Sequence, residues 1–206
     1  MKPAHHAKLA VGLVALTIAT PLARALDVFN YSAVANERFS SGFPSAPVAN
    51  TSGSFIGAGL DFSGVGWQTA STAFAVTMVS PMNFLAARHA SPSATNSVSF
   101  LGQDGQVHSY SVASITTIEY SSGVLSDLVV GTLTQAVASG ITYYPSIYLG
   151  SNLASYVGLN LAVYGQGGTV GLNSISGFTT ADFIPQDGVL DSLFSIMDYN
   201  SVTGGT

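Results

Sequence analysis

Short segments rich in β-branched and aromatic residues, separated by turn-forming residues, recur along most of this chain. Between two of them, residues 102–105 read Gly-Gln-Asp-Gly, and Asp-Gly readily supplies the positive φ that a tight hairpin needs. The sequence carries no amphipathic pattern long enough for a helix of more than three turns. The pattern therefore predicts an all-β barrel or sandwich. We expect its strands over residues 74–79, 96–101, 106–112, 114–120, 127–134, 159–165 and 169–175.

The N-terminus has the three parts of a secretory signal peptide. Lys2 and Lys8 give it a positive start, residues 9–22 are apolar, and Ala23-Arg24-Ala25 is a small-x-small cleavage site. The apolar run has 14 residues, fewer than the ~20 that a membrane-spanning helix needs. We expect residues 1–25 to be removed near Ala25 and the protein to be secreted or, in a bacterium, periplasmic.

Composition narrows the possible partners of the mature chain. Beyond residue 25 only Arg38 and Arg88 are basic, against ten Asp and Glu residues, so the net charge is −8. Without a basic patch, nucleic acid and anionic membrane surfaces are poor partners. The 47% hydrophobic content excludes a disordered chain, and the absence of cysteine means that a packed core must stabilise the fold. We expect no membrane span after cleavage.

One segment carries the chemistry. The expected strand over residues 74–79 is followed by a Ser-Pro turn, then by Phe84-Leu85-Ala86-Ala87, and then by His89 after one further residue. Asp127 follows His89 by 38 residues and begins the run Asp-Leu-Val-Val. This arrangement resembles the histidine and aspartate segments of the trypsin-like (chymotrypsin-fold) serine peptidases.

The resemblance implies both a fold and a set of roles. The fold would be two antiparallel Greek-key β-barrels, of which the second is incomplete. Residues 26–64 would form an N-terminal arm, residues 65–206 the barrel domain, and residues 139–153 a connection between the barrels. His89 would be the general base, and Asp127 would accept its Nδ1–H and orient it. The substrate would be a peptide or protein, and no metal or other cofactor is implied.

The serine nucleophile of such a site is not recognisable in these 206 residues. In the family's triad it follows the aspartate by about 90 residues, which projects to about position 220. Ser174 and Ser201 lack the Gly-x-Ser-Gly context of a nucleophile loop. The resemblance therefore implies a chain truncated before its nucleophile and inactive by itself.

Three alternatives bear on this interpretation. Asp104 also lies after His89, but its Asp-Gly hairpin turn already accounts for it. The low charge, the many Ser, Thr and Gly residues, and Arg88 beside His89 suit a secreted, non-catalytic surface or adhesion protein on a peptidase-like scaffold. A calcium site is the third possibility, but its four candidate ligands fit no EF-hand spacing and are better read as a solvated acidic surface: Asp182, Asp187, Asp191 and Asp198.

Overall fold

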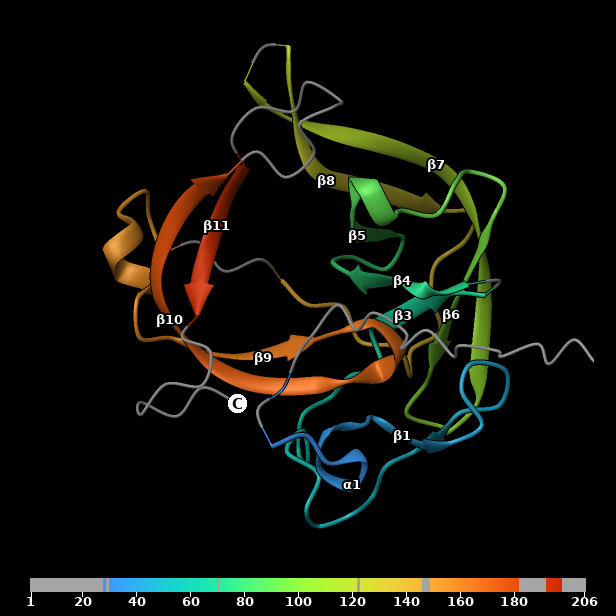
Figure 1. Cartoon of the computed structure of the whole chain (residues 1–206). Coiled ribbons are helices and arrows are strands. Elements are labelled where there is room, and N and C mark those ends of the chain that lie inside the picture. Colours follow the sequence, from blue (N-terminus) through green and yellow to red (C-terminus); the bar gives the residue numbers. More distant parts are fainter. Residues whose placement is uncertain are drawn as a thin grey trace, which may run out of the picture.

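The computed structural model describes residues 28, 30–69, 71–121, 123–145, 149–181 and 192–197. Secondary structure within these ranges is almost entirely β, with short helical turns between strands (Figure 1). The elements are α1 (Ala33–Asn36), β1 (Phe39–Ser41), β2 (Val48–Ala49), β3 (Val65–Gln68), β4 (Ser71–Met78), β5 (Asn83–Ala87), η1 (Arg88–Ala90), β6 (Ser97–Leu101), β7 (Val107–Ser121), β8 (Val124–Leu133), η2 (Leu153–Tyr156), β9 (Asn160–Tyr164), η3 (Gln166–Gly168), β10 (Val170–Ala181) and β11 (Ser192–Met197).

Six antiparallel strands close into a barrel in the order β3-β4-β5-β8-β7-β6. Strands β3, β4 and β5 follow one another, and the chain then crosses to place β6 beside β3. This is the Greek-key arrangement, in which a fourth strand returns to lie beside the first. The chain then runs back through β7, so that β8 pairs with β5 and completes the closure.

The barrel interior is the main hydrophobic core. Along β4, Val76 and Met78 are fully buried while the intervening Thr77 is not, as the two-residue period of a strand requires. The core cluster is Val76, Met78, Phe84, Ala86, Val98, Phe100, Tyr110, Val112, Val129, Leu133 and Ile141.

A second, smaller sheet lies beside the barrel (orange to red in Figure 1). Strand β10 is central and pairs antiparallel with β9 on one edge and β11 on the other. Among the described residues this sheet is open and has three strands. The prediction of an all-β fold with one closed Greek-key barrel and an incomplete second one is confirmed.

Several strands differ from those expected: β5 was not among them, and β4, β8 and β10 begin or end at other residues than the expected ranges. Residues 106–112 and 114–120 form the single strand β7, because an irregularity in its pairing with β8 between Val112 and Ser114 lets the strand continue without a turn. Strand β3 was not predicted as a separate strand, because its four residues are all buried and show no alternation. The predicted signal peptide lies outside the described residues.

The N-terminal arm is attached to the second sheet. The side-chain amide of Asn36 donates to the carbonyl of Val170 (3.1 Å), and the backbone N–H of Arg38 donates to the carbonyl of Gly168 (2.9 Å). The arm also contains three short elements of its own, α1, β1 and β2. The described helices have only three or four residues each, so none of them could span a bilayer.

Candidate active site

The pairing of β5 with β8 brings the two predicted site residues together. Phe84 lies opposite Gly131 and Ala87 opposite Leu128, so the strands are in continuous register up to the end of β5. One position further along, the chain turns into η1, which carries His89, while Asp127 precedes Leu128 on β8. Residues that are 38 positions apart in sequence therefore meet at one end of a strand pair.

A short turn presents the histidine. After Ala87 the backbone leaves the extended conformation and forms a 3₁₀ turn over Arg88–Ala90. The hydroxyl of Ser91 donates to the carbonyl of Arg88 (3.1 Å) and closes this turn. Ala86, just before the turn, is buried, and its small side chain allows close packing against the core. The turn is thereby fixed relative to the barrel.

Asp127 binds both the backbone and the ring of His89. Its Oδ1 accepts the backbone N–H of His89 at 3.1 Å, and its Oδ2 lies 2.7 Å from Nδ1 of the imidazole. Two contacts from one carboxylate fix the position and the rotation of the ring together. The proximity predicted from the sequence is observed.

The two side chains differ in their exposure to solvent. The Asp127 side chain is 11% exposed and that of His89 is 38% exposed. A buried carboxylate at hydrogen-bond distance favours the tautomer in which Nδ1 carries the proton, and it stabilises the imidazolium when the ring takes a second one. In that tautomer Nε2 is the basic nitrogen. The arrangement can accept and return a proton at Nε2.

The alternative aspartate, Asp104, lies elsewhere. Its Oδ2 is 2.9 Å from Nε2 of His108, on the hairpin between β6 and β7. A backbone hydrogen bond from Gln106 lowers the pKa of the Asp104 carboxyl, and His108 lowers it further. Asp104 is therefore a hairpin residue with its own histidine partner.

The other sequence candidates do not join the pair. Ser174 is exposed on β10, where its hydroxyl donates to Oδ1 of Asn160 (2.8 Å). Ser201 and the four aspartates considered for calcium lie outside the described residues. In the described ranges, no group of three or more His, Cys, Asp or Glu residues could hold a metal ion.

Sequence reasoning missed a second polar centre, in which Arg38 and Asp61 line a pocket between the arm and the barrel. A signal for it existed, because Arg38 is one of only two basic residues beyond residue 25 and is followed directly by Phe39. In a chain with so few charges, a cation next to an aromatic residue indicates that the cation has a structural or binding role.

Comparisons with known proteins add little to this geometry. No family model matches the sequence, and a search of curated proteins found no match. Among solved structures, the chain is similar to a mutant of human heparin binding protein (CAP37), with a TM-score of 0.44 and 11% sequence identity. The alignment covers 57% of this chain and 61% of that one, so this chain spans about three fifths of its length.

Proposed function

We propose that this protein is an exported serine-type endopeptidase of the trypsin-like kind, with His89 as the general base and Asp127 as the residue that orients it. On this proposal, the nucleophilic serine and the groups that stabilise the oxyanion come from sequence beyond residue 206. The chain of 206 residues would then be inactive by itself.

The observation that carries the proposal is the double contact of Asp127 with His89. One carboxylate oxygen accepts the backbone N–H and the other lies 2.7 Å from Nδ1. Holding the backbone and the ring together fixes Nε2 in one direction, which proton transfer to a fixed nucleophile requires. The Greek-key barrel supports the proposal, because its closure through β5 and β8 creates this contact.

The proposed chemistry is acyl transfer. Nε2 of His89 takes the proton of the serine hydroxyl as its oxygen forms a bond to the carbonyl carbon of the substrate. The imidazolium then gives that proton to the leaving amine as the carbon–nitrogen bond breaks. Asp127 remains ionised and stabilises the imidazolium throughout. In the second half, Nε2 takes a proton from water as the water oxygen bonds to the acyl carbon, and it returns that proton to the serine oxygen as the ester bond breaks.

Labelling by a fluorophosphonate probe tests the proposal on the full-length secreted product of the gene. The probe reacts only with an activated serine, so the proposal expects one labelled serine located beyond residue 206. A folded product that takes up no label would overturn the proposal and favour the alternative, a non-catalytic surface or adhesion protein on the same scaffold.

A further inference from the structure

A second site is built around a buried cation. Arg38 follows the end of α1 and is only 5% exposed. Its Nη1 donates to the carbonyl of Val65 (2.7 Å) and to the hydroxyl of Tyr164 (3.3 Å). Three aromatic rings surround the guanidinium, with centroids 4.8 Å (Phe39), 5.9 Å (Phe62) and 5.7 Å (Tyr164) from its central carbon. The cation therefore links the arm, the barrel and the second sheet.

These contacts leave one edge of the guanidinium available. An arginine has five N–H donors, and the two hydrogen bonds of Arg38 both come from Nη1. Nε and Nη2 make no hydrogen bond to the described part of the chain, and no described carboxylate lies within 4.0 Å of the group. The N–H groups of Nε and Nη2 are parallel, and this edge is the one that binds a carboxylate through two hydrogen bonds.

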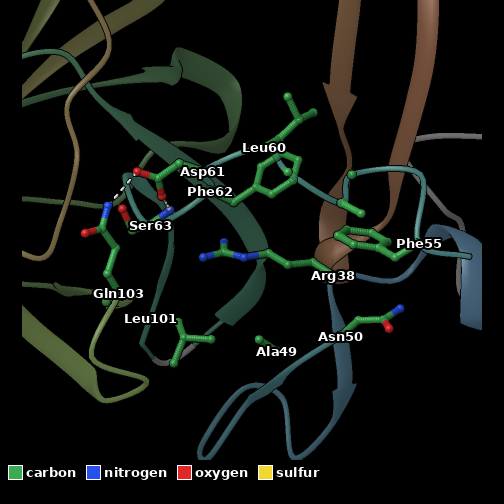
Figure 2. A pocket seen from close by; sticks show the side chains of 14 residues that line it. Arg38, Ala49, Asn50, Phe55, Leu60, Asp61, Phe62, Ser63, Leu101 and Gln103 are labelled. Carbon is green, nitrogen blue, oxygen red and sulfur yellow. Dashed lines mark hydrogen bonds between the residues drawn. The ribbon is translucent and has the colours of Figure 1, made fainter. Parts of the chain in front are cut away.

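Arg38 lines a pocket of about 210 Å³. Figure 2 shows the guanidinium pointing between Phe62 and Leu101 toward the wall formed by Asp61 and Gln103. Apolar side chains, including Leu60, supply much of the remaining lining. A cavity of about 150 Å³ holds a benzene molecule, so this pocket accommodates a ligand of about eight non-hydrogen atoms.

A fixed negative charge lines the far wall. Burial raises the pKa of Asp61, but hydrogen bonds from Thr142, Ser63 and Gln103 outweigh that effect and lower the pKa from 3.8 to about 2. The carboxylate is therefore ionised at neutral pH. It repels a second negative charge on any ligand that Arg38 holds.

We propose that this pocket binds a small monocarboxylate, with its two oxygens on Nε and Nη2 of Arg38 and its short apolar group against the apolar side chains of the pocket lining. Arg38 favours a ligand with one negative charge, and the ionised Asp61 disfavours a ligand with two. A neutral isostere lacks the charge that the cation needs, and a dicarboxylate meets the repulsion of Asp61. The proposal does not depend on peptidase activity.

Isothermal titration of the mature chain with isovalerate, its amide and methylsuccinate tests the site. We expect isovalerate to bind at least tenfold more tightly than either of the other two. A peptide that ends in valine presents the same carboxylate at a chain terminus. If that peptide binds more tightly than isovalerate, a chain end is the source of the carboxylate; if less tightly, a free acid is the source. Equal affinity for isovalerate and its amide would overturn the proposal.

Variants separate binding from a merely structural role of Arg38. Arg38→Lys replaces the bidentate guanidinium by a single ammonium group and should lower the affinity for isovalerate at least tenfold. A thermal unfolding curve checks that the variant is folded. Leu60→Trp places a larger side chain at an exposed position of the pocket lining and should also weaken isovalerate binding at least tenfold. Leu125→Trp adds the same ring to an exposed site outside the pocket and should change nothing.

Asp61→Asn tests the charge selectivity. It removes the opposing charge and should bring the affinity for methylsuccinate to within about threefold of that for isovalerate. Unchanged isovalerate affinity in Leu60→Trp, or unchanged selectivity in Asp61→Asn, would contradict the proposed site.

Discussion

The ring of Phe84 occupies the space that a side chain on Gly131 would fill. A Cβ built on Gly131 would lie 2.0 Å from Cζ of Phe84, and the two residues are directly opposite each other in the β5–β8 pairing. Phe84 is completely buried in the barrel core. This fit fixes the register of the two strands whose ends carry His89 and Asp127, so packing in the core determines the geometry of the candidate site.

Gly131→Ala is therefore expected to destabilise the fold. The added methyl group must displace a buried ring, which costs about 1–3 kcal/mol in the free energy of unfolding. Urea denaturation measures this change. Gly140→Ala is the matched control, because its Cβ would meet no atom closer than 3.7 Å and should change stability by less than about 0.5 kcal/mol. Equal stability of the two variants would contradict the packing account.

Asp127→Asn should lower catalysis by the full-length protein without unfolding it. The amide keeps the shape of the carboxylate, but its NH₂ group favours the wrong tautomer of His89 and cannot stabilise the imidazolium. In the triad of serine peptidases the equivalent change lowers kcat by about 10⁴-fold. Asp104→Asn alters the other histidine–aspartate pair, at 2.9 Å on the β6–β7 hairpin, and should leave kcat unchanged. A similar kcat in both variants would remove the assigned role of Asp127.

Asp61 should contribute to stability in a defined range of pH. Its pKa is about 2 in the folded protein and about 4 in an unfolded chain, so the folded state favours the ionised form. The stabilisation is present above pH 4 and is lost as the pH falls toward 2. Because the side chain is largely exposed to solvent, we expect a loss of about 1 kcal/mol.

Comparison of the wild type with Asp61→Asn isolates this contribution from those of other carboxyl groups. The difference in unfolding free energy between the two proteins should shrink between pH 4 and pH 2. A difference that stays constant over this range would show that the hydrogen bonds of Asp61 do not favour its ionised form.

The barrel was largely predictable because its signals are local. The hairpin around Asp104 follows from turn chemistry, and the alternation of Val76, Thr77 and Met78 shows which face of β4 is buried. Strand β3 and the continuous β7 were not predictable, because burial on both faces removes alternation and a bulge leaves no mark in residue type. These features depend on contacts between distant segments.

In the candidate sites too, features with a local sequence signal were predictable and features that depend on distant contacts were not. His89 and Asp127 could be selected because a known family spaces such residues similarly, and their contact depends on one strand pair. The environment of Arg38 could not be predicted, since its partners Val65 and Tyr164 lie 27 and 126 residues away. The sequence marks Arg38 as an unusual cation beside Phe39, but it does not show which distant residues surround it.

The most direct test of the central claim is kcat/KM for peptide hydrolysis by the full-length protein, with His89→Ala compared with His108→Ala. Both variants remove one imidazole from a pair with an aspartate. The account predicts that His89→Ala loses at least about 10⁴-fold in kcat/KM while remaining folded, and that His108→Ala retains wild-type kcat/KM. Full kcat/KM in folded His89→Ala would contradict the assignment of His89 as the general base.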